Sequence, residues 1–200
     1  MEIKLPIDSL TGVILAGGRS SRFGSDKVFA RYKGESFLDH ALAVMGHLFQ
    51  KVVVVTNNPE KFEGLSVSLL KDKIPFRGPA GAIATALRAV KTQGIFAVAC
   101  DMPLLSEGLI LKLLKEEDGS SLVLYRHRIG VEPLCAIYRY SLLPILEYRL
   151  RFGRDDLHSL CEESISVQKV PISTSEKRSL LNVNTQKQYI SLLDDSHVFY

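Results

Sequence analysis

The chain has 200 residues, of which 46% are hydrophobic and 24% are charged, a balance that suits one globular domain with a substantial core. Its formal net charge is only +3 and no long run of Lys and Arg concentrates it, which argues against nucleic acid or a membrane surface as a partner. The three cysteines lack Cys-x-x-Cys spacing, so a disulfide framework and a zinc site are both disfavoured. With neither a signal-peptide pattern nor an apolar run of the roughly 20 residues that span a bilayer, we expect a cytoplasmic protein with buried thiols.

Strand-like and helix-like patterns alternate from the N-terminus onwards. Residues 13–16 and 52–56 are short, β-branched, apolar runs, which predict buried parallel strands. Between them, apolar residues recur at steps of three and four over residues 37–49, which predicts an amphipathic helix. The alternation continues with predicted strands at 67–70 and 95–99 and predicted helices at 81–90 and 106–117. We therefore expect an α/β fold, a single-domain, Rossmann-like three-layer sandwich with a mostly parallel sheet.

The segment after the first predicted strand is a glycine-rich loop with two basic residues. Gly17, Gly18 and Gly24 let the backbone take positive φ and approach an anion without a Cβ atom in the way. Arg22 and Lys27 add positive charge that suits a triphosphate, whose leaving pyrophosphate gains charge during reaction. The spacing fits neither the P-loop nor the dinucleotide fingerprint. The alternative is an ordinary glycine-rich turn with solvated basic side chains.

Polar residues follow three further predicted strands, at the edge where parallel α/β sheets bind ligands. Asn57 follows the second strand, Asp72 the third and Asp101 the fourth. A carboxylate such as Asp101 at the end of a buried strand suits Mg²⁺ that bridges triphosphate oxygens, with a turn or helix-capping residue as an equal alternative. An ordinary turn is the alternative at Asn57. Residues 78–81 form the start of the helix predicted after Asp72. The backbone amides at the N-terminus of this helix are therefore expected at the ligand-binding edge of the sheet.

Five segments together resemble a known family. The loop at residues 15–27 matches every fixed position of Leu-x-Gly-Gly-x-x-x-Arg-x-Gly-x-x-Lys, which resembles the signature of the nucleotidyltransferase superfamily. Four later segments extend the likeness to the molybdenum cofactor guanylyltransferases; they are residues 78–81, 99–103, 132–138 and 181–185. The last of these contains Asn-Val-Asn-Thr, whose spacing favours this branch of the superfamily. The resemblance covers nearly the whole chain.

The resemblance implies an enzyme that transfers GMP from GTP to the terminal phosphate of molybdopterin, with Mg²⁺ as cofactor and pyrophosphate as the second product. An acceptor phosphate is already anionic, so catalysis reduces to positioning and charge stabilisation without a general base. Residues 10–105 would bind the nucleotide and residues 106–200 the acceptor. Other proteins of molybdenum cofactor biosynthesis or molybdoenzyme maturation are further candidate partners. The nucleotide contacts are expected at Leu15, Ala16, Gly17, Gly18, Lys27, Asn57, Asp72 and Asp101. Arg22, Lys27 and Asp101 are the catalytic candidates, Asp101 is also the metal ligand, and Asn182 and Asn184 are candidates for acceptor binding.

Two positions depart from the family's pattern. Val55 stands where the first polar side chain of a short trio is usual, and Ala82 stands where a second glycine is usual. Both departures affect the positioning of the base rather than the chemistry. Two alternatives therefore stay open, a cytidylyl- or uridylyltransferase that acts on another small organic phosphate, and a nucleotide-binding module without catalytic activity.

Basic residues in the second half of the chain have two interpretations. Arg126, Arg128, Arg149, Arg151 and Arg154 are candidates for a wall that binds an anionic pterin phosphate. A solvated helix face is the favoured alternative for Arg149 and Arg151.

Overall fold

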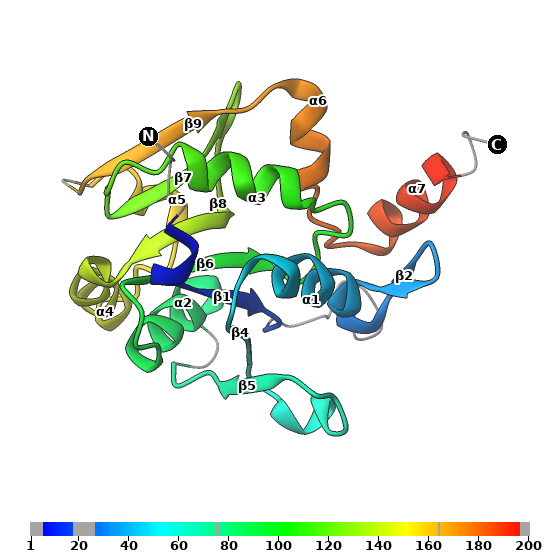
Figure 1. Cartoon of the computed structure of the whole chain (residues 1–200), viewed down its shortest axis with the longest axis horizontal. Helices are drawn as coiled ribbons and strands as arrows, with labels where there is room; N and C mark the ends of the chain where they lie inside the picture. Colours follow the sequence, from blue (N-terminus) through cyan, green and yellow to red (C-terminus); the bar gives the residue numbers. More distant parts are fainter. Residues whose placement is uncertain (1–5, 18–26, 75–76, 164, 197–200) are drawn as a thin grey trace.

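The computed structural model describes residues 6–17, 27–74, 77–163 and 165–196 (Figure 1). Its strands are β1 (Leu10–Leu15), β2 (Arg31–Tyr32), β3 (Glu35–Ser36), β4 (Val52–Thr56), β5 (Ser68–Lys71), β6 (Gly94–Ala99), β7 (Leu122–His127), β8 (Gly130–Arg139) and β9 (Val167–Pro171). Seven of them form one sheet in the order β5-β4-β1-β6-β8-β7-β9, and β2 pairs with β3 in a separate hairpin.

The central strands of the sheet are parallel and aligned at their carboxyl ends. β1 pairs in parallel with β4 on one side and with β6 on the other, which places Leu15 beside Val55 and Ala99. β8 is antiparallel to both of its neighbours, and β7 pairs in parallel with β9. The prediction of a mostly parallel sheet is therefore confirmed, with β8 as the antiparallel strand. Residues that follow β4, β1 and β6 leave the sheet along the same edge.

Helices cover both faces of this sheet. They are α1 (Phe37–Leu48), α2 (Gly78–Ala89), α3 (Glu107–Lys115), α4 (Leu143–Arg151), α5 (Leu157–Leu160), α6 (Thr174–Lys177) and α7 (Gln186–Ser196). Short 3₁₀ segments are η1 (Pro6–Ser9), η3 (Lys27–Phe29), η4 (Pro59–Phe62), η5 (Tyr140–Leu142) and η6 (Arg178–Leu180). The core forms two clusters, one with α1 and α3 and the other with α2, α4 and α5. The predicted three-layer sandwich is confirmed.

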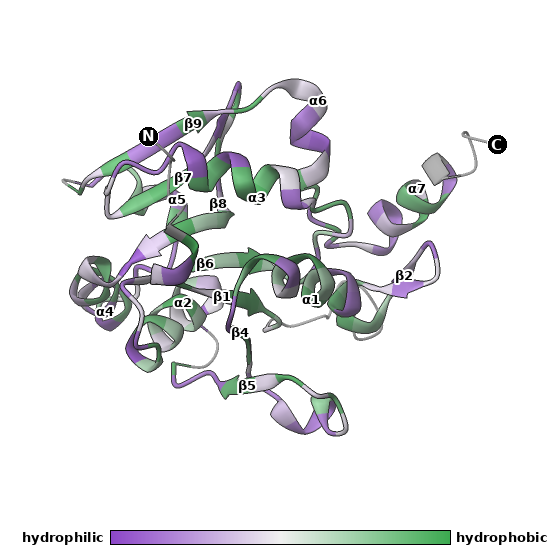
Figure 2. Ribbon diagram, in the orientation of Figure 1, coloured by the Kyte–Doolittle hydropathy of each residue, from purple (hydrophilic) through white to green (hydrophobic). Residues whose placement is uncertain are grey.

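Burial explains why the strand and helix patterns differ. All six residues of β1 and all six of β6 are buried, so these strands are hydrophobic along most of their length (Figure 2). In α1 only one face is buried, and Ser36 caps its first turn by accepting a hydrogen bond from Asp39 N at 3.1 Å. Gly12 suits the close packing of α1 on β1, because a Cβ atom there would make tight contacts of 3.1 Å with side-chain atoms of Met45 and Phe49.

Some boundaries and elements differ from the sequence predictions. α2 begins at Gly78 instead of residue 81, because Gly78 and Pro79 form its first turn, a position where proline is favoured. The hairpin of β2 and β3 and the strands β7 and β9 were not predicted. The three cysteines Cys100, Cys135 and Cys161 are free and buried, as expected. No helix in the described part of the chain is long and apolar enough to cross a membrane.

Candidate functional site

A cavity of about 610 Å³ lies at the edge of the sheet where β4, β1 and β6 end. Its volume is within the range of about 300–1,000 Å³ that is typical of small-molecule sites. Every predicted nucleotide-binding residue that the structure describes lines it. The lining residues are Leu15, Ala16, Gly17, Lys27, Val28, Phe29, Val55, Thr56, Asn57, Asn58, Lys61, Phe62, Asp72, Gly78, Pro79, Ala82, Ala99, Cys100, Asp101, Leu134 and Asn184.

Lys27 joins parts of the chain that are distant in sequence. Its ammonium group forms an ion pair with the Asp101 carboxylate and donates a hydrogen bond to Asn184 Oδ1 at 2.7 Å. Asp101 comes shortly after β6 and is 8% exposed, and its carbonyl oxygen accepts a hydrogen bond from Val183 N at 3.0 Å. That backbone contact holds the segment 182–185 against the end of β6. Two predicted catalytic residues and one predicted acceptor residue are therefore in direct contact.

Asp72 presents a carboxylate with a fixed orientation to the cavity. Its backbone N–H donates to Thr56 O at 2.8 Å, which continues the pairing of β5 with β4. Its Oδ1 atom accepts hydrogen bonds from Ile74 N and Thr85 Oγ1, both at 2.9 Å. Among the hydrogen bonds of the described residues, none reaches Oδ2 of Asp72. One carboxylate oxygen is therefore held by the protein, and the other remains available to a donor in the cavity.

Asn57 brings an unpaired oxygen to the same cavity. Within the described structure its Oδ1 atom is buried and has no hydrogen-bond partner. Its amide nitrogen lies close to Gly17, because a Cβ atom on Gly17 would be 3.3 Å from Asn57 Nδ2. Buried polar atoms are almost always paired in folded proteins, so the unpaired oxygen makes Asn57 a candidate contact for a ligand. A glycine at residue 17 leaves room for that amide.

The two departures from the family pattern have different structural outcomes. A Cβ atom on Gly81 would lie 2.6 Å from Ile74 O, so Gly81 is the glycine that close packing requires. Ala82 lies next to it on α2 and lines the cavity, and the close approach is made at Gly81. Val55 is fully buried on β4 and also lines the cavity. Neither substitution disturbs the backbone of the site.

Asn182 lies apart from the cavity lining. Its amide nitrogen donates weakly to Leu180 O at 3.5 Å, and its Oδ1 atom is buried without a partner among the described residues. It is close to Glu132 of β8, which sequence reasoning did not select. Burial raises the pKa of the Glu132 carboxyl to about 7, a hydrogen bond from Leu134 N opposes this shift, and the charge of Asp101 adds to it.

Several lining residues were not selected from the sequence because they belong to no motif there. Phe29 of η3 and Phe62 of η4 lie with their ring centroids 5.8 Å apart, and Lys61 adds a cation beside them. Cys100 also lines the cavity, but burial raises the pKa of its thiol well above the ordinary value, so it is not a nucleophile at neutral pH. Gly18 and Arg22 lie outside the described residues, and their roles stay predictions.

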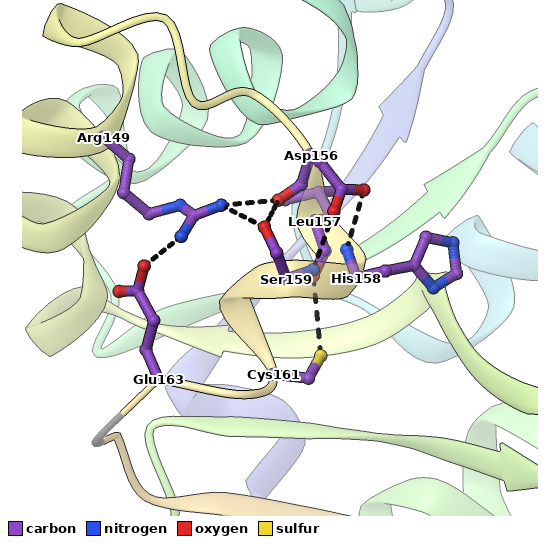
Figure 3. Close-up of polar contacts among 7 residues, drawn as sticks. All are labelled: Arg149, Asp156, Leu157, His158, Ser159, Cys161 and Glu163. Atoms are coloured by element: carbon purple, nitrogen blue, oxygen red, sulfur yellow. Dashed lines mark hydrogen bonds and ion pairs between the residues drawn. The ribbon is translucent and has the colours of Figure 1, made fainter.

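Arg149 contradicts both interpretations of the basic residues. It is 4% exposed and forms an ion pair with Glu163, and its other terminal nitrogen donates to Asp156 O at 2.8 Å and Ser159 Oγ at 2.6 Å (Figure 3). Asp156 in turn caps α5, accepting from Ser159 N at 2.8 Å. The guanidinium therefore ties α4 to α5 and is neither a wall for an anion nor a solvated face. An arginine is buried this way when every donor it turns inward has a partner.

A parallel sheet with a cavity at the carboxyl ends of its central strands is the arrangement of nucleotide-binding α/β proteins. Residues 12–167 match the family of the MobA-like NTP transferase domain. The chain is 30% identical over 188 residues to the molybdenum cofactor guanylyltransferase of Desulfosudis oleivorans, covering 91% of this chain and 93% of that protein. It is also 30% identical over 185 residues to the protein of the same name from Syntrophotalea carbinolica, covering 90% and 88%. The chain therefore belongs to the MobA-like NTP transferase family, in its molybdenum cofactor guanylyltransferase branch.

The fold agrees with this membership. The structure of molybdopterin-guanine dinucleotide biosynthesis protein A from Archaeoglobus fulgidus superposes with a TM-score of 0.81, over 95% of this chain and all of that one, at 23% identity. The resemblance stated from the sequence is confirmed by the family model and by the two relatives, which cover 91% and 90% of the chain.

Proposed function

We propose that this protein transfers GMP from GTP to the terminal phosphate of molybdopterin and releases pyrophosphate. The observation that carries the proposal is the contact of Lys27 with both Asp101 and Asn184, in a cavity that Asp72 and Asn57 also line. Residues carried over for the nucleotide and for the acceptor thus meet at one point. The names of the relatives, which are molybdenum cofactor guanylyltransferases, support the choice of the two substrates.

In this proposal Asp72 and Asn57 bind the nucleoside part of GTP. Asp72 offers a carboxylate oxygen and Asn57 an unpaired amide oxygen, both of which accept hydrogen bonds. The edge of guanine carries two donors, the N1–H and the 2-amino group, which suit such acceptors. Adenine and cytosine present an unprotonated ring nitrogen at the corresponding place, so they would leave a buried acceptor unpaired, which costs about 1–3 kcal/mol.

Lys27 and Arg22 are assigned to the phosphates. An oxygen of the acceptor phosphate attacks the α-phosphorus of GTP, the bond from that phosphorus to the β-phosphate oxygen breaks, and pyrophosphate leaves. The two cations stabilise the negative charge that grows on the leaving group. The acceptor oxygen is already anionic, so the side chains have no proton to remove. The acceptor is bound by residues 106–200. Within this half of the chain Asn184 contacts it and, by family resemblance, so does Asn182.

Asp101 is the proposed ligand for Mg²⁺. The described residues contain no cluster of three His, Cys, Asp or Glu side chains that would hold a metal ion alone. Mg²⁺ at phosphoryl-transfer sites is commonly held by one or two carboxylates together with substrate oxygens and water, so a single strand-end carboxylate fits it. The ion would supply positive charge to the triphosphate. Since Asp101 pairs with Lys27, a metal ion must compete with the Lys27 ammonium for that carboxylate.

The cytoplasm is the proposed location, because three free and buried thiols suit a reducing compartment.

The test measures pyrophosphate release with each of the four nucleoside triphosphates, with and without molybdopterin. We expect release only with GTP, molybdopterin and Mg²⁺ together, and GTP to bind at least about tenfold more tightly than CTP in calorimetric titration. A preference for CTP or UTP, or release that does not depend on molybdopterin, would contradict the proposal.

A further inference from the structure

Thr85 lies in an otherwise apolar part of α2 and contacts the cavity only through another residue. It is the one side chain with a polar group among residues 78–87 of the sequence, and it is 3% exposed. Its hydroxyl donates to Asp72 Oδ1 at 2.9 Å and accepts from Lys73 N at 3.1 Å. A buried hydroxyl in an apolar helix face is costly unless it is hydrogen-bonded. Here the Thr85 hydroxyl is paired both as a donor and as an acceptor.

The two hydrogen bonds of Thr85 fix the carboxylate of Asp72. A carboxyl group attached through one CH₂ turns freely unless its oxygens are held, because this terminal torsion has broad minima. Thr85 Oγ1 and Ile74 N both donate to Oδ1, and Lys73 N is tied to the same hydroxyl. Holding Oδ1 in this way determines where Oδ2 points. Asp72 lines the cavity, whereas Thr85 does not.

We propose that Thr85 is a positioning residue that sets the base selectivity of the site by aiming the free oxygen of Asp72 at the donor edge of a guanine base. The inference rests on the proposed function, because it takes GTP as the nucleotide. Without the hydroxyl the carboxylate has one donor fewer, and Lys73 N loses its partner. An acceptor that points elsewhere binds guanine less well, whereas adenine, which has no donor at its N1 position, loses nothing by the change.

The test is a calorimetric titration of GTP and ATP into the wild type, Thr85→Val and Thr85→Ser, with the thermal midpoint measured for each. Valine keeps the shape of threonine and removes the hydroxyl, and serine keeps the hydroxyl. We expect Thr85→Val to weaken GTP binding about tenfold, or roughly 1.4 kcal/mol, and to change ATP binding less than about twofold. Thr85→Ser retains the wild-type preference for GTP over ATP. If Thr85→Val does not fold, Thr85→Ala provides the same comparison.

Two results overturn the inference: an unchanged ratio of GTP to ATP affinity in Thr85→Val, or an equal loss for both nucleotides, which would indicate a merely structural role. Failure of the proposed function looks different, because it appears in the wild type. A wild type that binds ATP as tightly as GTP contradicts the proposed function, whereas a wild-type preference for GTP that Thr85→Val retains contradicts only the role of Thr85.

Discussion

Replacement of Asp101 by asparagine tests the proposed active site at its centre. The change keeps the size and one oxygen of the side chain, and it removes the charge that pairs with Lys27 and that would hold Mg²⁺. We expect kcat for pyrophosphate release to fall by about 10²–10³, the range found when one preorganised electrostatic group is removed.

The effect of Asp101→Asn on stability follows from the same contact. The side chains of Lys27 and Asp101 are 19% and 10% exposed. Their pair therefore lies between a surface pair, worth about 0–1 kcal/mol, and a buried one, whose disruption costs about 3–5 kcal/mol. Asn184 Oδ1 remains a partner for the ammonium at 2.7 Å. We expect the free energy of unfolding to fall by about 1–2 kcal/mol, which lowers Tm by roughly 2–8 °C in a domain of this size.

Two assays separate the chemical effect from the structural one. Turnover is measured well below Tm, and GTP binding is titrated with and without Mg²⁺. We expect Mg²⁺ to strengthen GTP binding in the wild type and this strengthening to be lost in Asp101→Asn. Asp155→Asn is the matched control, because Asp155 is 45% exposed and its carboxylate lies 3.9 Å from Arg77 at the surface. The control variant retains wild-type turnover.

The reasoning is refuted if Asp101→Asn keeps wild-type turnover, or if Mg²⁺ strengthens GTP binding equally in the variant and the wild type. Either result would show that this carboxylate neither holds the metal ion nor acts on the triphosphate.

Three further substitutions test other parts of the structure. Gly17→Val places a branched side chain against Asn57, whose Nδ2 would lie 3.3 Å from the new Cβ atom. Calorimetry should detect no GTP binding to this variant, while its Tm is retained. Unchanged GTP affinity would contradict a close approach of the backbone to the nucleotide at residue 17. Burial raises the pKa of Glu132 to about 7, so the folded state favours the neutral carboxyl. Urea unfolding at each pH should therefore show the free energy of unfolding of the wild type, relative to Glu132→Gln, falling by at most about 3 kcal/mol as pH rises from 4.5 through 7. A difference in unfolding free energy that does not change with pH would contradict the raised pKa. Arg149→Met leaves Glu163 unpaired and should lower the free energy of unfolding by about 2–4 kcal/mol with turnover retained at low temperature, whereas loss of turnover in folded protein would restore a binding role.

Sequence patterns predicted the elements whose burial is uniform. The β-branched runs that became β1 and β4 lie in the centre of the sheet, where both faces are covered, so most of their side chains are apolar. The one-sided pattern of α1 was predicted for the opposite reason, since one face meets the sheet and the other meets solvent. The two-residue strands β2 and β3 are too short to carry a pattern, and the basic and polar end of β7 conceals its buried start.

The strand-end rule accounts for the part of the site that was predicted. Asn57, Asp72 and Asp101 were selected because each follows a strand, and all three line the cavity. Lys27 and Asn184 were each selected, for separate roles, but their contact spans 157 positions along the chain and was not predicted. Arg149 was misjudged because an arginine in a helix is normally solvated, and its burial depends on partners in and around α5 that only the folded chain brings to it.

The residues that orient the site obey a different rule from the residues that line it. The lining residues selected from the sequence follow strands, whereas Thr85 is buried within α2 and reaches the cavity through one hydrogen bond to Asp72. Its signal in the sequence is a single hydroxyl inside an apolar helical segment that begins at the ligand edge, where an unpaired polar group would be costly. Base selectivity can therefore change by substitution outside the cavity, while Lys27 and Asp101, which act on the phosphates, keep their contact.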